Sequence, residues 1–267
     1  MAIGTAMAMV LIKMIQNSFS FTDLHTHILP TVDDGAKNMQ ISINMLRLQK
    51  KTGTDRVMLT PHFYPTRQKL DAFLLKRERA YSELLSCWDE DTMPHLRLGV
   101  EVRYTPLLAQ MDLQQLTLSD SKYLLLELPD FGPIPFLDKV IDRMLSQNIT
   151  PILAHVERCD LFRDTPECLY KLIKMGAIAQ IDVMALIGKS KSKFAKICLK
   201  NGLAQIVGSD MHNLTDRALT IGSVQLKEEL QQLQNAEIFA RAVWEDTPLP
   251  PFAVSSLRKG LFGYRLG

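Results

Sequence analysis

Seven short apolar runs alternate with helical segments, and this alternation constrains the fold more than any other feature of the sequence. The runs cover residues 22–27, 56–61, 96–102, 123–128, 151–154, 177–183 and 204–208. Helical periodicity appears over residues 39–51, 70–85, 136–147, 169–175 and 194–200. Such alternation predicts an α/β protein with parallel strands inside and helices outside. We expect a barrel rather than an open sheet, because no glycine-rich dinucleotide loop follows the first run.

The composition indicates one globular domain. The chain has 267 residues, is 46% hydrophobic and carries a net charge of +2, which argues against nucleic acid as a partner. No linker rich in proline or serine precedes residue 248, so we expect a single domain over residues 21–267. We expect residues 1–20 to be an extension that is either disordered or the result of a misassigned start, with Met14 as the candidate true start. Their apolar stretch precedes Lys13, the wrong order for a signal peptide, and is too short to span a bilayer. A cytoplasmic protein without membrane insertion is expected.

Five of the six histidines stand at the predicted C-terminal ends of strands, and three acidic residues accompany them. The histidines are His25, His27, His62, His155 and His212, and the acidic residues are Glu101, Glu127 and Asp210. His95 instead begins a strand, so we expect it to be structural. In a barrel of parallel strands, the C-terminal strand ends form the active face. Imidazole and carboxylate groups gathered there suit zinc, manganese or iron.

Each of these residues also has an ordinary structural explanation. The His-x-His pair at residues 25–27 could lie on a surface loop, and a lone histidine such as His155 is more often a core imidazole. Either glutamate could pair with Arg97 or Arg103, and Asp210 could cap a helical turn. Their occurrence together favours metal binding, because buried carboxylates and imidazoles need charge partners that metal ions supply.

The cysteines give no sign of thiol chemistry. Cys87, Cys159, Cys168 and Cys198 form no pair at two-residue spacing, and none is followed by arginine six positions later. The chain therefore lacks a zinc ribbon and the phosphate loop of cysteine-dependent tyrosine phosphatases. Sparse cysteines are typical of a reducing compartment.

Six motifs occur in order along residues 21–217. They are DLHTHILP with DDG at residues 23–35, TPH at 60–62, GVE at 99–101, LELP at 126–129, LAHVER at 153–158 and SDMHN at 209–213. Together they resemble the polymerase-and-histidinol-phosphatase (PHP) superfamily. Within it, the chain is most similar to bacterial manganese-dependent protein-tyrosine phosphatases linked to capsular and exopolysaccharide synthesis.

The resemblance implies a distorted (β/α)7 barrel with three divalent metal ions, expected to be Mn²⁺, with iron or zinc as alternatives. The first metal would be held by His25, His27, Glu101 and Asp210. The second would be held by Glu101, Glu127 and His155, and the third by Asp34, His62 and His212. Asp34 is preferred to Asp33 because it directly precedes the glycine. Arg158 and Arg217 would bind the substrate phosphate, and Asp210 is a further catalytic candidate.

Three departures from the family bear on substrate preference. Val156 replaces a proline, Phe63 replaces a second histidine, and residues 180–185 replace a small, glycine-containing stretch. The resemblance as a whole implies hydrolysis of phosphotyrosine in a protein, with a bacterial tyrosine kinase of polysaccharide synthesis as the expected partner. The alternatives are a small-molecule phosphatase acting on a substrate such as histidinol phosphate, and a non-catalytic docking module.

Overall fold

The computed structural model describes residues 20–187, 192–223, 227–260 and 263–266. The expected extension over residues 1–20 therefore lies outside the described residues, except for Ser20. Within the described part, no helix combines the length and the apolar character needed to cross a membrane.

Parallel strands form the centre of the molecule. They are β1 (Phe21–Thr26), β2 (Thr54–Leu59), β3 (His62–Phe63), β4 (His95–Leu98), β5 (Glu101–Arg103), β6 (Tyr123–Glu127), β7 (Thr150–Leu153), β8 (Ile178–Asp182) and β9 (Ile206–Gly208). Two of the expected strands are each interrupted, giving β2 with β3 and β4 with β5. His62 therefore begins the short β3 instead of ending the strand before it.

The strands form two sheets that join at both sides. One sheet has the order β1-β2-β4 and the other β3-β5-β6-β7-β8-β9. Across the interruptions, the N–H of Gly99 donates to the Leu59 carbonyl and that of Glu101 to the Pro61 carbonyl. After β9, the N–H of Asp210 donates to the His25 carbonyl and that of His27 to the Met211 carbonyl, each at 2.9 Å. The expected distorted α/β barrel is confirmed.

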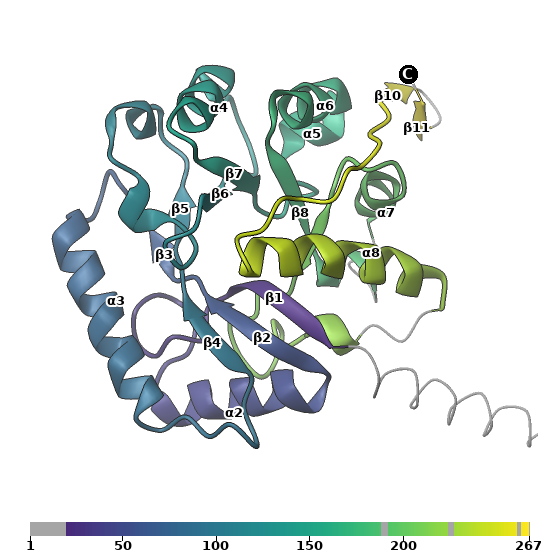
Figure 1. Cartoon of the computed structure of the whole chain (residues 1–267). Helices are drawn as coiled ribbons and strands as arrows, with labels where there is room; N and C mark the ends of the chain where they lie inside the picture. Colours follow the sequence, from purple (N-terminus) through teal and green to yellow (C-terminus); the bar gives the residue numbers. More distant parts are fainter. Residues whose placement is uncertain (1–19, 188–191, 224–226, 261–262, 267) are drawn as a thin grey trace, which may run out of the picture.

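Helices cover the outside of the strands, as Figure 1 shows. They are α2 (Met39–Lys51), α3 (Leu70–Leu85), α4 (Leu137–Ser146), α5 (Asp160–Asp164), α6 (Pro166–Met175) and α7 (Lys193–Lys200). Short 3-10 turns occupy Pro106–Gln110, Gln114–Leu116, Val183–Leu186 and Ile221–Ser223. The Asn38 side chain caps α2 by accepting from the N–H of Ile41, and Gly176 ends α6 in the left-handed conformation that glycine adopts without cost.

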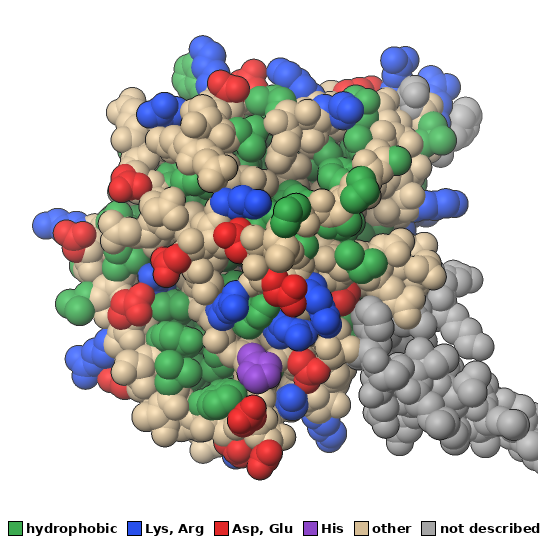
Figure 2. Space-filling view, in the orientation of Figure 1, with side chains coloured by type: hydrophobic (Ala, Val, Ile, Leu, Met, Phe, Trp, Pro, Cys, Tyr) green, Lys and Arg blue, Asp and Glu red, His purple; other side chains and the backbone are tan. Residues whose placement is uncertain are grey.

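Two C-terminal elements were not anticipated from the sequence. Helix α8 (Lys227–Trp244) lies across the barrel, and the antiparallel hairpin of β10 (Leu257–Gly260) and β11 (Gly263–Leu266) lies beside α6 (Figure 1). Figure 2 shows the same side of the molecule, where acidic and basic side chains are interspersed without a field of one sign.

The two faces of the strands bury different groups. Outward residues such as Leu124 and Leu126 pack in the large cluster shared with the surrounding helices. Inward residues such as Tyr123 and Leu125 pack in a second cluster with Ala240, Val243 and Trp244 of α8. Since side chains alternate along a strand, Glu127 lies on the same face as Tyr123 and Leu125. The barrel interior is thus apolar where α8 covers it and polar at the C-terminal strand ends.

Candidate metal centre

Three overlapping clusters of imidazoles and carboxylates lie at the C-terminal strand ends. They are His25, His27, Glu101 and Asp210; His27, Asp34, His62 and His212; and His62, Glu101 and Glu127. Within each cluster the nitrogen and oxygen atoms lie within 4.8 Å of one another. All of these residues are buried except Asp34, which is exposed, and Glu127, which is partly buried.

The first cluster is the most compact. The Nε2 atoms of His25 and His27 lie 3.2 Å apart, and each is 3.2 Å from Glu101 Oε2 and 3.3 Å from Asp210 Oδ1. Such separations are those of donor atoms that surround one ion at about 2.0–2.1 Å. Asp210 has a positive φ of 49°, which is uncommon for a residue other than glycine and is typical of functional sites.

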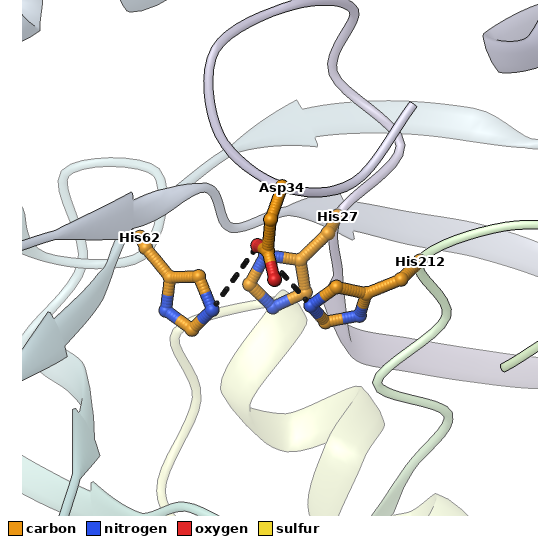
Figure 3. Close-up of side chains that lie close together, drawn as sticks. All are labelled: His27, Asp34, His62 and His212. Carbon is orange, nitrogen blue, oxygen red and sulfur yellow. Dashed lines mark ion pairs between the residues drawn. The ribbon is translucent and has the colours of Figure 1, made fainter. Parts of the chain in front are cut away.

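The second cluster forms because the loop after β1 folds back over the strand ends. Figure 3 shows the Asp34 carboxylate between the imidazoles of His62 and His212. Asp34 Oδ1 lies 3.6 Å from His62 Nε2 and 3.5 Å from His212 Nε2. Gly35 permits this fold, since a Cβ atom there would lie 1.9 Å from the carbonyl oxygen of His27. Asp34, the residue directly before this glycine, is thus the carboxylate that faces the histidines.

The third cluster differs in one member from the set that the resemblance implies. His62 Nδ1 lies 2.9 Å from Glu101 Oε2 and 3.7 Å from Glu127 Oε2. His155 contacts Glu101 through its other oxygen, with 3.1 Å between His155 Nε2 and Glu101 Oε1. Glu101 therefore contacts His62 through Oε2 and His155 through Oε1, so that His155 lies beside the third cluster.

The sequence also allowed Glu101 and Glu127 each to pair with a nearby arginine, and within the described residues this holds only for Glu127. Arg103 Nη1 lies 2.7 Å from Glu127 Oε1, which leaves Oε2 for the cluster. The Arg97 guanidinium instead lies 4.6 Å from the centre of the Trp244 ring and donates to the Trp244 carbonyl. Among the described residues, no ion pair joins Glu101 to an arginine.

The charge distribution of the centre favours a cation at its middle. Burial by itself lowers the pKa of His25, but Glu101 and Asp210 outweigh it and raise that pKa above its usual value. Burial likewise raises the pKa of Glu101 and the pKa of Asp210. The neighbouring groups outweigh burial, with His25 as the largest opposing influence, and both pKa values are lowered. The buried carboxylates thus favour positive charge at this position, which a bound cation would also supply.

Unsatisfied polar atoms support the same conclusion. Four buried atoms of the centre make no hydrogen bond of suitable geometry within the described residues: His62 Nδ1, Glu101 Oε2, Glu127 Oε2 and His212 Nε2. A buried polar atom without a partner is costly, and metal coordination would satisfy all four. The residues present therefore fit a group of divalent ions.

Two arginines reach the centre from its rim. Arg158 and Arg217 both donate from Nη2 to Asp210 Oδ2, with 2.7 Å between Arg158 and that oxygen. Asp182 at the end of β8 also accepts from Arg158 Nη2. Both arginine side chains are about one-third exposed, at 33% and 32%. They can therefore meet a ligand from solvent while they remain fixed against Asp210.

Comparison with known proteins agrees with this arrangement. Residues 21–241 match the model of the family described as capsular polysaccharide synthesis, CpsB/CapC. The chain belongs to the CpsB/CapC family.

Relatives of this CpsB/CapC protein include named phosphatases. It is 31% identical over 259 residues to the tyrosine-protein phosphatase YwqE of Bacillus subtilis, covering 91% of this chain and 99% of the relative. It is 30% identical over 214 residues to the tyrosine-protein phosphatase CpsB of Streptococcus pneumoniae, covering 73% and 84%. A solved structure superposes on this chain with a TM-score of 0.75 at 27% identity, covering 87% of this chain and 99% of that chain. Its description is of YwqE from Bacillus subtilis and CpsB from Streptococcus pneumoniae as unique metal-dependent tyrosine phosphatases.

Two polar residues to which the sequence analysis assigned no role in the centre, Asp33 and Gln180, orient the histidines of this CpsB/CapC protein. Asp33 Oδ2 lies 2.7 Å from His27 Nδ1, and Gln180 Oε1 lies 3.0 Å from His25 Nδ1. Each contact directs the Nε2 atom of its histidine toward the centre. Gln180 and Asp182 alternate within the otherwise apolar β8, and this spacing was the available signal. Gly208 makes room for Gln180, because a Cβ atom there would lie 2.1 Å from Gln180 Nε2.

A cavity of about 370 Å³ lies beside Arg158 on the same rim. Its lining comes from segments that follow β6, β7 and β8 and from Ser192: Asp130, Phe131, Glu157, Arg158, Arg163, Asp182, Met184, Ala185 and Ser192. Burial, together with the nearby Asp182 carboxylate, raises the pKa of Glu157 to about 8.

Proposed function

We propose that this protein is a metal-dependent phosphomonoesterase that hydrolyses phosphotyrosine in a protein. One observation carries the proposal: Arg158 and Arg217 converge on one oxygen of Asp210 while its other oxygen faces His25 and His27. Phosphate-binding cations and a fitting metal site thus share one carboxylate. The relatives named tyrosine-protein phosphatases support phosphotyrosine over a small phosphomonoester.

We assign nine residues to the three metal ions: His25, His27, Asp34, His62, Glu101, Glu127, His155, Asp210 and His212. Bound divalent ions supply Lewis acidity and lower the pKa of water, so that hydroxide is available at neutral pH. Manganese suits this mixture of imidazole and carboxylate ligands better than magnesium, which prefers oxygen ligands and retains its water.

The two arginines would bind the phosphate. A guanidinium presents paired N–H donors that match phosphate oxygens, and its charge stabilises negative charge that moves during ester cleavage. Asp210 would position both guanidinium groups rather than donate a proton. Although burial raises its pKa, His25 and its other cationic neighbours lower it overall, so it is ionised. The tyrosine phenolate, with a pKa near 10, can leave without a strong acid.

A bacterial tyrosine kinase of capsule or exopolysaccharide synthesis is the proposed protein substrate. The family description links the CpsB/CapC proteins to capsular polysaccharide synthesis, and phosphotyrosine on such a kinase is the substrate class that fits the proposed chemistry. Because protein phosphorylation consumes ATP, we place the reaction in the cytoplasm.

The proposal is tested by substrate comparison with manganese-loaded protein. We expect hydrolysis of a phosphotyrosine peptide with a kcat/KM at least tenfold above that for histidinol phosphate, since the tyrosine phenolate is a better leaving group than the alkoxide of histidinol. A higher kcat/KM for histidinol phosphate would contradict the proposed substrate. No release of phosphate from any phosphomonoester, with metal bound, would instead indicate a docking module.

A further inference from the structure

The cavity beside Arg158 adjoins the proposed phosphate site directly, because Arg158 lines one and contacts Asp210 in the other. Its other walls also stand at the C-terminal ends of β6–β8, on the rim that carries the metal ligands. A polypeptide whose phosphotyrosine meets Arg158 would therefore lay a neighbouring residue over this cavity. Its volume of about 370 Å³ lies in the range of pockets that hold small organic groups.

The apolar part of the wall suits an aliphatic chain. Phe131 is 73% exposed at the mouth, and Met184 and Ala185 follow β8. An exposed aromatic ring beside a cavity can cover a methylene stem and also attract a cation to its face.

The polar part of the wall is an incompletely paired set of carboxylates. Both arginines of the wall are already paired, Arg158 with Asp182 and Asp210, and Arg163 with Asp160. Glu157 is only 5% exposed, and although its Oε1 accepts from the N–H of Asp182, its Oε2 has no hydrogen-bond partner among the described residues. A buried carboxylate oxygen without a partner is costly unless a ligand supplies one.

The remaining acidic residue of the wall adds negative charge. No ion pair to the Asp130 side chain occurs within the described residues, and Asp130 is only partly buried. The cavity thus offers two acidic groups that form no ion pair within the described residues, next to an apolar surface. They are Glu157, whose Oε2 lacks a hydrogen-bond partner, and Asp130 nearer the surface.

We propose that this cavity is a specificity subsite that binds a lysine or arginine side chain of the substrate polypeptide, close in sequence to the phosphotyrosine. The stem would pack against Phe131 and Met184, and the charged head would donate a hydrogen bond to the unpartnered Oε2 of Glu157 and pair with the Asp130 carboxylate. The inference rests on the proposed phosphotyrosine hydrolysis and adds the sequence context in which that residue is preferred.

The test uses phosphotyrosine peptides that differ at one position. Lysine, norleucine or glutamate is placed in turn at each of the three positions before and after the phosphotyrosine, and kcat/KM is measured with manganese-loaded protein. At one position or more we expect lysine to exceed norleucine roughly tenfold, with glutamate lowest, because a partly desolvated charge pair forms. The preference should decrease at high salt, which screens charges.

Variants assign the preference to this cavity. Glu157→Gln keeps the shape and the Oε1 acceptor but replaces the unpartnered Oε2 by an amide nitrogen that cannot accept from a cation. Asp130→Asn removes the negative charge at a less buried position. We expect each variant to reduce the lysine-to-norleucine ratio to about threefold or less. The matched control Asp71→Asn, on exposed α3 away from the cavity, should keep the wild-type ratio. Because the lysine-to-norleucine ratio of kcat/KM is compared, a variant that loses activity on all peptides equally keeps the wild-type ratio.

The outcomes separate this inference from the proposed function. If no phosphotyrosine peptide is hydrolysed, the proposed function itself fails. If the peptides are hydrolysed but lysine is preferred at none of the six positions, the function stands and the cationic subsite is overturned. A lysine preference that is unchanged in both Glu157→Gln and Asp130→Asn would also overturn it.

Discussion

Asp33 and Asp34 are neighbours in sequence but occupy different environments. Asp34 is exposed and faces His62 and His212, whereas Asp33 is partly buried, with only 6% of its side chain exposed, and contacts His27. Burial raises the pKa of Asp33, but the His27 charge and several hydrogen bonds outweigh it and lower the pKa to about 2. Asp33 Oδ1 also accepts from the N–H of Gly35, and Oδ2 from that of His62. These positions support the proposal that Asp34 binds metal and that Asp33 holds the side chain of His27 and the backbone of the loop in place.

Replacing each aspartate should separate the two roles. We expect Asp33→Ala to weaken manganese binding about 10–100-fold while all metals still bind at saturating concentration, because the orientation of His27 is lost. Asp34→Ala should instead remove one metal ion from the saturated protein, because a ligand is lost. Equilibrium dialysis with elemental analysis measures both affinity and stoichiometry. A reduced stoichiometry in Asp33→Ala would show that Asp33 is itself a ligand.

Arg158 should contribute to turnover and not to metal binding. We expect Arg158→Ala to lower kcat/KM on a phosphotyrosine peptide about a hundredfold, since a fixed cation near the changing phosphate charge is lost. Metal content should stay unchanged. The control Arg79→Ala removes an 81%-exposed arginine paired with Glu83 and should leave kcat/KM intact. Near-normal activity of Arg158→Ala would show that its ion pairs are only structural.

Thiol chemistry should play no part in the reaction. Burial raises the pKa of Cys159, of Cys168 and of Cys198, so these groups are thiols rather than nucleophilic thiolates. Cys87 is exposed at the end of α3. We therefore expect replacement of all four cysteines by serine to spare the kcat/KM of the folded protein. Isolation of a stoichiometric phosphocysteine intermediate would contradict this.

At the scale of elements, α8 completes the barrel that carries the centre. Its residues Ala240, Val243 and Trp244 pack against inward residues of the strands, including Tyr123 and Ile178. Glu237 of the same helix accepts from the N–H and the hydroxyl of Thr22 in β1. Because β1 carries His25 and leads directly into His27, the helix supports a strand that positions two of the proposed ligands. We expect its contribution to appear as stability rather than as chemistry.

A pair of substitutions on α8 tests this role. Trp244→Ala should lower the free energy of unfolding by about 3 kcal/mol, because a buried ring and its contact with the Arg97 guanidinium are both lost. Ile238→Ala, on the 57%-exposed face of the same helix, should change it by less than about 0.5 kcal/mol. Urea unfolding at saturating manganese gives both values. Equal small effects would mean that α8 does not stabilise the barrel.

At the scale of the whole molecule, the proposed ligands connect distant parts of the chain. They extend from His25 to His212 and come from the ends of strands in both sheets. Metal ions bound among them would link strands that hydrogen bonds join only locally. Metal binding should therefore contribute to stability as well as to catalysis, since a ligand that binds only the folded state stabilises it.

Removal of metal should show both effects together. We expect exhaustive chelation to abolish phosphatase activity and to lower Tm by several degrees, and manganese to restore both better than magnesium. Activity assays, differential scanning calorimetry and elemental analysis are done on the same samples. Full activity in protein shown to contain no metal would contradict the metal-dependent mechanism.

The sequence by itself determined the class of fold and the groups gathered at the centre. Apolar runs with intervening helical periodicity predicted α2 and α3 at their observed bounds and located the barrel strands within a few residues. Of the five histidines expected at strand ends, four lie in the observed clusters with Glu101, Glu127 and Asp210, and His155 lies beside them. Parallel strands bring their C-terminal ends to one rim, which is why the sequence could anticipate this gathering. These features depend on local spacing and on topology, both of which a sequence expresses directly.

The tertiary structure decided which groups meet. It placed His62 with Glu101 and Glu127, brought Gln180 to His25 over 155 positions, and directed Arg97 to Trp244 instead of a glutamate. Helix α8 repeats apolar residues at Leu233, Ala236, Ala240 and Val243, but only the packed barrel shows what they cover. Contacts between residues far apart in sequence depend on side-chain directions and strand register, which local patterns do not specify. The cavity beside Arg158 likewise exists only once β6, β7 and β8 lie side by side.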